Sequence, residues 1–228
     1  MIKFCDEIME MAFKKMPHRN IVNMLCSMGV DSVAAAHYCN SNLHKVSGSL
    51  YMRHFNHGVR DQNNQMQKSY IRYMRDPDIG FKGYAPADLK PFIKNFSEDG
   101  LRQARLEFIK KNADYTIYIT AHHLDDATES YMMNVLRGKE NFLPIPFMTE
   151  VGTNLIVHPF LFTRKQDFRE YAEKNNLMKY VVEDETNRVT KGSRRNFIRN
   201  EIMPLLNREQ MGVPTIVRKK MEKRLHGF

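Results

Sequence analysis

The stretch IVNMLCSMGVDS, residues 21–32, decides the fold of this chain. Its first half is a short apolar run of the kind that forms a buried strand, which we place at Ile21–Cys26. The pattern after it predicts a helix from about Ser32 to Asn40. The polar residues between the two therefore form a turn that joins a strand to a helix, which is the repeating unit of a parallel α/β sheet.

The rest of the 228-residue chain continues this alternation of short apolar runs and helical patterns. The further strands that we expect are Leu50–Asn56, Ile79–Tyr84, Tyr115–Thr120 and Leu155–Phe160. The further helices that we expect are an amphipathic one at the N-terminus, followed by Gln62–Arg75, Gly100–Asn112, Asp125–Leu136 and Lys165–Asn175. The segment Pro144-Ile145-Pro146 predicts a loop over one edge of the sheet.

The pattern changes near Asp184, where Asn, Arg and Lys become frequent, and the final residues VRKKMEKRLHGF are basic. A chain of this length suits one large domain, since a typical domain has roughly 150 residues. We expect an α/β domain in residues 1–183 and a basic helical extension of the same domain in residues 184–228. A separate small domain in residues 184–228 is the alternative.

The composition is that of a folded, basic protein. Apolar residues make up 42% and charged residues 27% of the chain, which excludes a disordered or fibrous protein. Lys and Arg number 35 against 26 Asp and Glu, so the formal net charge is +9. This excess favours an anionic partner, with nucleic acid, nucleotide and an acidic membrane surface as candidates.

The cysteines and the hydropathy indicate the compartment. Cys5, Cys26 and Cys39 form no CxxC pair, which excludes a disulfide framework and an all-cysteine metal site. No apolar run approaches the ~20 residues of a membrane span. Acidic residues and lysines interrupt the apolar positions at the N-terminus, so this segment is not a signal peptide. We therefore expect a cytoplasmic protein with no membrane partner.

The turn Cys26–Ser32 has the composition of a phosphate-binding loop. Backbone N–H groups at the start of a helix can surround a phosphate, and Ser27 and Ser32 add hydroxyl donors. Gly29 lets the backbone approach closely. Asp31 repels a phosphate unless a cation bridges them, which suggests a magnesium-bound nucleotide. The alternative is an ordinary turn in which Asp31 or Ser32 caps the helix.

A second polar cluster, TAHHLDDATES at residues 120–130, lies at the end of the strand Tyr115–Thr120. Asp126 and Glu129 are three residues apart on one helix face, and His122 lies just before them. Two carboxylates and an imidazole can hold a cation, either a metal ion or an ammonium group. The spacing is not HExxH, which argues against a zinc hydrolase. The alternative is a helix whose acidic start is favoured by the helix dipole.

A third cluster, RRNFIRN, occupies residues 194–200. Arg195 and Arg199 are four residues apart on a predicted helix, so they can hold one phosphate between them. A solvated basic face is the alternative.

Together these motifs resemble those of the tRNA(Ile)-lysidine synthetases, which are N-type ATP pyrophosphatases of the PP-loop superfamily. The turn SMGVDS at residues 27–32 is similar to the family's SGGxDS loop. The other matching segments, in the family's order, are NHGVRD at 56–61, LRQARLE at 101–107, HHLDDATES at 122–130 leading into LRG at 136–138, and Asp184, Thr186, Asn187, Arg195, Asn196, Ile198 and Arg199.

The resemblance implies a Rossmann-like sheet flanked by helices, similar to the adenine nucleotide alpha hydrolases. It also implies a two-step reaction that uses ATP, Mg²⁺, free L-lysine and tRNA. In the first step ATP adenylates the C2 oxygen of a wobble cytidine and pyrophosphate leaves. In the second step the lysine amine attacks C2 and expels AMP.

The resemblance also assigns expected roles to residues. ATP binding falls to Ser27, Met28, Gly29, Val30, Asp31, Ser32, His57 and Arg60, with Asp31 also holding Mg²⁺. Binding of lysine or phosphate falls to Arg102, Arg105, Asp126 and Glu129, and binding of tRNA phosphate to Arg195, Asn196 and Arg199. The catalytic roles fall to Asp31, His122, Asp126 and Glu129.

The chain departs from the family pattern at two positions. Met28 replaces a glycine, which can reshape the loop or crowd the nucleotide, and His158-Pro159 replaces Arg-Pro. The chain ends soon after the catalytic domain, so we expect a short form without the family's C-terminal tRNA-binding domains.

Three other functions stay open at this point. A tRNA thiolase is disfavoured by the lack of a CxxC pair, and a small-molecule amidating enzyme by the lack of a glutaminase domain. A non-catalytic nucleic-acid-binding protein is the third, because Met28 can mark a degenerate loop. The oligomeric state is also open, with a homodimer among the options.

Overall fold

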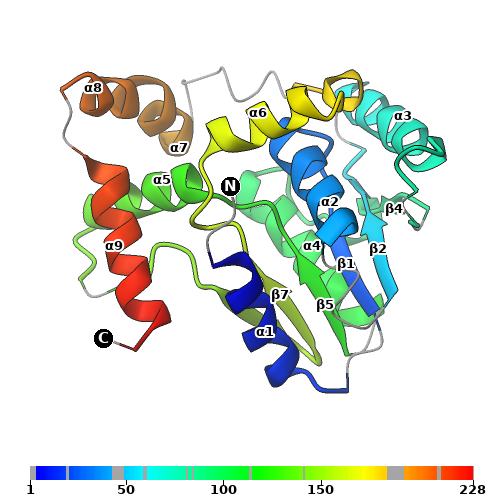
Figure 1. The fold of residues 1–228 in the computed structure, drawn as a ribbon, viewed down its shortest axis with the longest axis horizontal. Coiled ribbons are helices and arrows are strands. Elements are labelled where there is room, and N and C mark those ends of the chain that lie inside the picture. The colour runs from blue at the N-terminus through cyan, green and yellow to red at the C-terminus, as the bar shows by residue number, and fades with distance from the viewer. Residues whose placement is uncertain are drawn as a thin grey trace.

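The computed structural model describes residues 4–18, 21–42, 49–58, 61–80, 82–83, 85–112, 115–140, 142–183, 193–209 and 212–227. Its main sheet has five strands in the order β2-β1-β5-β7-β6 (Figure 1). These strands are β1 Ile21–Leu25, β2 Ser49–Arg53, β5 Thr116–Ile119, β6 Met148–Val151 and β7 Asn154–Val157. All neighbours pair in parallel except β6, which is antiparallel to β7. A second, two-stranded sheet pairs β3 Phe55–Asn56 with β4 Ala87–Asp88.

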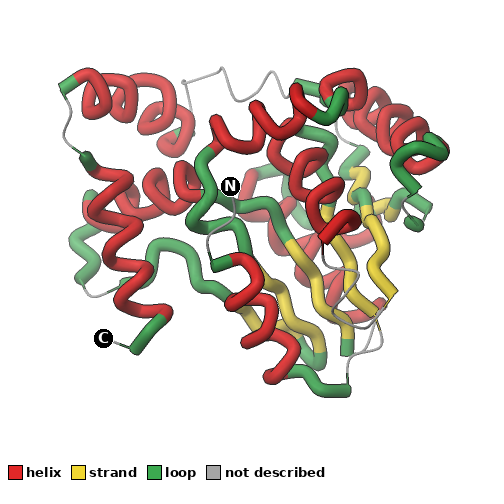
Figure 2. Tube along the Cα trace, viewed as in Figure 1, coloured by secondary structure: helices red, strands yellow, loops and turns green. Residues whose placement is uncertain are grey.

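Helices surround the main sheet (Figure 2). The α-helices are α1 Cys5–Lys15, α2 Val30–Asn42, α3 Asp61–Arg75, α4 Glu98–Asn112, α5 Leu124–Val135, α6 Lys165–Lys174, α7 Arg194–Phe197, α8 Met203–Arg208 and α9 Val213–Leu225. The other helical turns are the 3₁₀ turns η2 Lys90–Phe92 and η3 Met178–Tyr180 and the π-helical turn η5 Ile198–Ile202. The predicted Rossmann-like α/β fold with a helical C-terminal part is confirmed.

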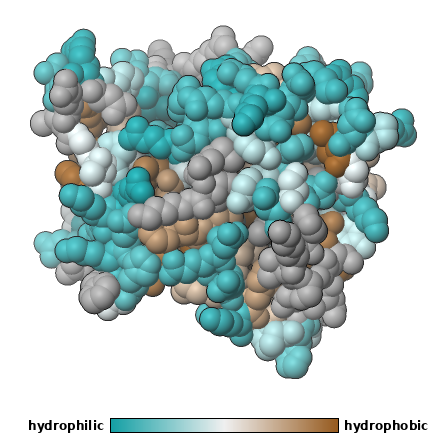
Figure 3. All heavy atoms as spheres, viewed as in Figure 1, coloured by the Kyte–Doolittle hydropathy of each residue, from teal (hydrophilic) through white to brown (hydrophobic). Residues whose placement is uncertain are grey.

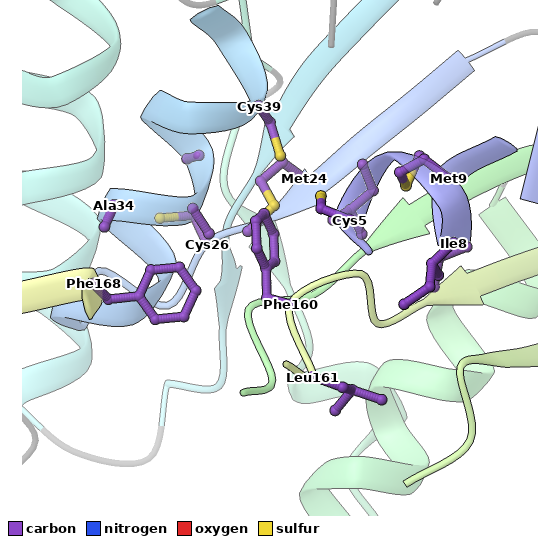
Figure 4. Packing of buried hydrophobic residues seen from close by; sticks show 14 of the residues in the cluster. Cys5, Ile8, Met9, Met24, Cys26, Ala34, Cys39, Phe160, Leu161 and Phe168 are labelled. Atoms are coloured by element: carbon purple, nitrogen blue, oxygen red, sulfur yellow. The ribbon is translucent and has the colours of Figure 1, made fainter. Parts of the chain in front are cut away.

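The central strands β1, β5 and β7 are buried on both faces because their side chains alternate between two hydrophobic clusters. In β5, Ile117 and Ile119 lie in the larger cluster and Tyr118 in the smaller one. Figure 4 shows the larger cluster, in which Cys5 of α1 and Cys39 of α2 pack near β1. All three cysteines are free and buried.

The order of the strands places the site. From β1 the chain runs through α2 to β2 on one side, whereas β5 lies on the other side of β1. The strand order therefore reverses between β1 and β5, and open parallel sheets bind ligands outside the carboxyl ends of the strands at such a point. The turn at residues 26–29 and the cluster at residues 120–130 follow these two neighbouring strands.

The predicted strand Ile79–Tyr84 is wrong as a strand. Ile79 and Gly80 belong to a turn in which both backbone N–H groups donate to the Asp76 carbonyl, and Gly80 has a φ of 61°. Only a single bridge between Gly83 and Met52 pairs there, while Phe81 and Tyr84 lie outside the described residues. The glycine in the left-handed region bends the chain out of the extended conformation.

The predicted strand Leu50–Asn56 divides into β2 and β3. His54 stands between them, is buried, and its Nδ1 lies 2.8 Å from the Cys26 carbonyl oxygen. This contact ties the end of β2 to the turn after β1.

The edge strand β6 was not predicted. It forms a hairpin with β7 across Gly152 and Thr153, and Gly152 has a φ of 61°. The segment Pro144-Ile145-Pro146 is irregular and leads into this edge strand, and the Pro144 carbonyl accepts a hydrogen bond from Ser130. β7 itself ends at Val157, before Pro159.

The C-terminal helices contact the rest of the fold directly. α9 packs on α5, and its Val217 and Met221 are fully buried in the larger hydrophobic cluster. Within the described ranges, no helix has the length and apolar character to cross a membrane.

Candidate active site

The turn after β1 is held by hydrogen bonds among its own polar groups. Ser27 N–H donates to Ser32 Oγ at 3.1 Å, and Ser32 Oγ donates to the Gly29 carbonyl at 3.0 Å. The two hydroxyl oxygens of Ser27 and Ser32 lie 3.1 Å apart. The loop is therefore shaped before any ligand is bound.

Gly29 is the residue that caps α2. The helix starts at Val30, and the Gly29 carbonyl accepts from Val33 N–H at 3.0 Å. Asp31 and Ser32 therefore lie inside the first turn, so the alternative in which one of them caps the helix does not describe this turn. The first N–H groups of a helix have no acceptor within it, so this end of α2 can bind an anion.

Met28 adopts a left-handed conformation with a φ of 68°, which glycine adopts more easily. Its side chain is fully buried, with Sδ 3.5 Å from Cys26 Sγ. Its carbonyl accepts a hydrogen bond from Val182 N–H at 2.8 Å. The methionine therefore fills core space, and the strain of about 1 kcal/mol expected for a side chain at this φ is offset by burial.

Asp31 has the geometry to hold a bridging cation. One carboxylate oxygen, Oδ2, lies 3.5 Å from His123 Nε2, and the other, Oδ1, is buried without a hydrogen-bond partner in the described structure. An unpaired buried carboxylate oxygen suits Mg²⁺, which binds through one or two carboxylates together with substrate phosphates. No three His, Cys, Asp or Glu side chains of the described chain form a metal site by themselves.

His123 lies at the centre of three carboxylates. Its nitrogens are 3.4 to 3.6 Å from oxygens of Asp31, Asp125 and Asp126. Burial alone lowers its pKa, but the charge of Asp126 and the contact with Asp31 outweigh it and raise the pKa to about 9. A charged imidazole carries hydrogens on both nitrogens, so in that state the 3.4 Å contact of Asp126 N–H with His123 Nδ1 is not a hydrogen bond.

Asp126 also helps to start α5, because its Oδ2 accepts from His123 N–H at 3.1 Å. Burial acts to raise its pKa, but the charge on His123, together with the hydrogen bond from the His123 backbone N–H, outweighs burial and lowers it. Asp126 is therefore a carboxylate at neutral pH. Asp126 therefore both stabilises the start of α5 and supplies a negative charge to the cluster around His123.

Glu129 is buried and paired with Arg199. Arg199 Nε donates to Oε1 at 2.6 Å and its second nitrogen donates to Oε2 at 2.8 Å, so the pair is bidentate. The same guanidinium lies 3.4 Å from Asp126 Oδ1, and Arg195 Nε is 3.8 Å from Glu129 Oε2. Burial raises the pKa of Glu129 against the opposing effect of Arg199. The short bidentate contact requires the ionised carboxylate, and we take the pair as charged.

His122 forms a second cluster with Thr120 and His158. Thr120 Oγ1 lies 2.8 Å from His122 Nδ1 and 2.5 Å from His158 Nδ1, and the two ring nitrogens are 3.1 Å apart. Burial lowers the pKa of both histidines and outweighs the opposing charge of Asp126. The charges of Arg195 and Arg105 lower the pKa of His122 further, and His122 and Arg102 do the same for His158. Both rings are therefore neutral at pH 7, as a proton acceptor must be.

The remaining predicted residues lie around this centre. Burial and the charge of Arg105 lower the pKa of His57 to about 4, and its Nδ1 is buried without a partner within the described structure. Arg102 acts electrostatically on His158. The backbone N–H of Asn196 donates to Ser193 Oγ at the start of α7. Arg60 and the segment with Asp184, Thr186 and Asn187 lie outside the described residues.

The structure thus brings Asp31, Asp126, Glu129, Arg195 and Arg199 into one chain of contacts that His123 links. His122 lies beside this chain, and the charges of Asp126 and Arg105 act on it. Arg105 also acts electrostatically on His57, and Arg102 acts on His158. Sequence reasoning assigned no role to His123, Thr120 or His158. Two adjacent histidines before an acidic helix start are the sequence feature that points to His123. The histidine at position 158, where the family has arginine, does not by itself indicate a role.

The helix that carries Arg199 is irregular. The π-helical turn η5 lies between α7 and α8, and Met203 N–H donates to the Ile198 carbonyl five residues earlier. Pro204 follows at once, and its ring would clash with the carbonyl four residues before it in a regular α-helix. The wider turn removes this clash, and such turns occur often at functional sites.

Comparisons with known proteins identify the family of this chain. A family model described as a PP-loop domain matches residues 4–206. The tRNA(Ile)-lysidine synthase of Enterococcus faecalis is 30% identical over 199 residues, which are 85% of this chain and 42% of that protein. The tRNA(Ile)-lysidine synthase of Coxiella burnetii is 28% identical over 186 residues, 80% of this chain and 40% of that protein. The chain thus spans less than half the length of these relatives.

Among solved structures, the U34-tRNA thiolase NcsA from Methanococcus maripaludis matches with a TM-score of 0.68 over 99% of this chain and 80% of that one. At 17% identity this likeness shows the fold alone. The family model, in contrast, spans the loop after β1, the cluster after β5 and the arginines of α7 and η5. The resemblance found in the sequence is confirmed, and the chain belongs to the PP-loop domain family.

Proposed function

We propose that the protein ligates L-lysine to C2 of a wobble cytidine in tRNA, using ATP and releasing AMP and pyrophosphate. The observation that carries this proposal is the chain of contacts from Asp31 through His123 and Asp126 to Arg199 and Glu129. It connects a loop suited to phosphate with a group of charges suited to an amino acid. The names of the two curated relatives support the same reaction.

In this proposal the loop after β1 binds the phosphates of ATP. The N–H groups at the start of α2 and the hydroxyls of Ser27 and Ser32 surround them, and Asp31 would hold Mg²⁺. The ion, when bound, offsets phosphate charge and polarises the reacting phosphorus. His57, Arg60, Arg102 and Arg105 complete the binding of nucleotide or lysine carboxylate. Holding three substrates together supplies much of the rate enhancement.

The second step requires a neutral amine. Asp126 and Glu129 would bind lysine's ammonium groups, and His122 would accept a proton from the attacking one, since its lowered pKa keeps it neutral. Both oxygens of Glu129 are held by Arg199 in this structure. We therefore propose that Arg199 turns towards substrate phosphate when tRNA binds, together with Arg195 and Asn196, and frees Glu129 for lysine.

The cysteines favour this reaction over thiolation. Burial raises the pKa of Cys26 to about 11, and it raises the pKa of Cys5 and Cys39 as well. Buried thiols of high pKa are poor nucleophiles and poor sulfur carriers. Three free buried thiols also fit a reducing cytoplasm.

The test is transfer of labelled lysine to total tRNA in the presence of ATP and Mg²⁺. We expect label in tRNA, with AMP and pyrophosphate formed in equal amounts. ADP and orthophosphate as the only nucleotide products, or tRNA without label, would contradict the proposal.

A further inference from the structure

A pocket of about 580 Å³ lies between α5 and the start of α7. Met133, Leu136 and Phe197 form its apolar walls, and Arg137 and Arg194 lie beside them. Figure 1 shows α5 and α7 next to each other, and Figure 3 shows brown hydrophobic atoms among teal ones on this side of the molecule. None of the roles assigned above uses this pocket.

Its apolar side chains are unusually open to solvent. Leu136 is 72% exposed and Phe197 is 50% exposed. An exposed aromatic ring beside an exposed leucine is typical of a binding surface, since folded proteins rarely leave such groups together in water. The ring can therefore receive a flat ligand on its face.

The charges around the pocket are not neutralised. Arg137 and Arg194 are exposed, and neither forms an ion pair with a carboxylate in the part of the chain that the structure describes. Arginines that are free of carboxylates favour an anionic ligand. A flat ring and free guanidinium groups together match a nucleotide, whose base stacks on aromatic side chains while its phosphates pair with arginine.

The position of the pocket indicates which nucleotide it holds. Met133 follows Glu129 by four residues on α5, so the pocket begins one helical turn, or about 5.4 Å, beyond that carboxylate. The phosphate loop lies at the other end of the contact chain, beyond Asp126, His123 and Asp31. A base in this pocket is therefore not the base that reacts with ATP, but one beside it.

We propose that this pocket binds an unstacked base of tRNA that flanks the reacting cytidine, with Arg137 and Arg194 on the adjoining phosphates. The inference rests on the proposed function for the identity of the RNA. The contact is a stacking interaction on Phe197, which tolerates different bases because every base has an aromatic face.

The absence of tryptophan from the chain allows a direct test. Phe197→Trp places the only tryptophan of the chain in the pocket, and its fluorescence, excited at a wavelength that tyrosine does not absorb, should be quenched by titration with a short anticodon stem-loop RNA. The matched control is Ile216→Trp on α9, which is 54% exposed and lies outside the pocket, and it should not be quenched. A fully paired RNA duplex, which has no unstacked base, should leave both fluorophores unchanged.

Affinity gives a second readout. Phe197→Ala should weaken stem-loop binding by about fivefold to a hundredfold, the range found when one stacking aromatic is removed, and Phe197→Tyr should bind as wild type. Unchanged affinity of Phe197→Ala would overturn the inference. Quenching of the Phe197→Trp fluorophore by protein concentration alone would also overturn it, because a second copy of the chain would then cover the pocket.

These measurements need neither ATP nor lysine. Quenching by the stem-loop without any lysine transfer would therefore leave the pocket established and reject only the proposed function. Normal lysine transfer together with normal stem-loop affinity in Phe197→Ala would instead support the proposed function and reject only the role of the pocket.

Discussion

At the scale of single residues, Asp31 and Glu129 mark the two ends of one chain of charges. Asp31, in the first turn of α2, has one buried oxygen without a hydrogen-bond partner in the described structure, whereas both oxygens of Glu129 accept from Arg199. Removal of the charge of Asp31 should therefore affect a different step of the reaction from removal of the charge of Glu129.

Asp31→Asn should reduce pyrophosphate release by at least about a hundredfold, because loss of a metal ligand or of its charge removes several kcal/mol of phosphate stabilisation. The fold should be kept, since Gly29 and not Asp31 caps α2. Pyrophosphate release and thermal unfolding measure both effects. Asp125→Asn is the matched control, because Asp125 also contacts His123 but is more exposed. Equal activity of the two variants would reject the metal role.

Glu129→Gln should block or slow lysine transfer while pyrophosphate release stays measurable. The amide cannot bind an ammonium group as a carboxylate does, and a lost charged partner in a buried site typically costs about 3–5 kcal/mol. Separate assays of the two steps, with lysine concentration varied, measure the change in KM.

Arg199→Lys distinguishes direct from indirect action of Glu129. If Glu129 only positions Arg199, both variants should impair the two steps in the same ratio. A selective loss of the lysine step in Glu129→Gln supports the direct contact, and normal lysine transfer by that variant would contradict it.

At the scale of elements, the helix α7–η5–α8 decides where the arginines lie. A π-helical turn changes the angle between residues before and after it, and here it begins after Arg195 and contains both Arg199 and Asn200. Pro204 gives the turn a local cause. The irregular helix is therefore part of the site.

Pro204→Ala should let this helix become regular. The restored backbone N–H and the relief of the ring clash should stabilise the protein by about 1 kcal/mol. This gain is smaller than the cost of about 3 kcal/mol that proline has in the interior of a regular helix. The altered direction of Arg199 should lower lysine transfer by about tenfold. Thermal unfolding and lysine transfer are the measurements, and unchanged transfer with a higher Tm would show that the π-helical turn has no role in the reaction.

At the scale of the whole molecule, the charge centre should make stability depend on pH. The pKa of His123 is raised to about 9, so the folded state holds its proton more tightly than the unfolded state does. This contribution, about 3 kcal/mol, is complete below pH 6.5 and is lost as the pH rises through 9. Stability should therefore fall between pH 7 and pH 10.

Denaturant unfolding of the wild type and of His123→Asn at both pH values measures this effect. Asparagine is a good helix N-cap, and the hydrogen bond from the backbone N–H of residue 123 to Asp126 does not depend on the side chain, so the variant keeps the start of α5. Other groups titrate in this range in both proteins, and the difference between the two isolates His123. Equal losses of stability from pH 7 to pH 10 would show that His123 is neutral in the folded protein.

Local sequence patterns determined the parallel sheet, the loop after β1 and the acidic start of α5. Apolar runs and helical periodicity depend on neighbours within a few residues, so they can be read without knowing the fold. The same reasoning misplaced Ile79–Tyr84 and overlooked β6, because a short edge strand depends on the strand beside it. The sequence also placed the two main motifs after separate strands that the sheet brings side by side.

Only the tertiary structure decided which charges meet. Glu129 and Arg199 are 70 residues apart, and His122 and His158 are 36 residues apart. No local pattern encodes such pairs, because they form only when β5, β7 and the C-terminal helices pack together. Tertiary packing also decides where the Met28 side chain lies. Its position in the sequence suggested a crowded loop, but the side chain is buried in the core. Sequence spacing thus determines which groups each element offers, and the long-range packing of the elements determines which of them touch.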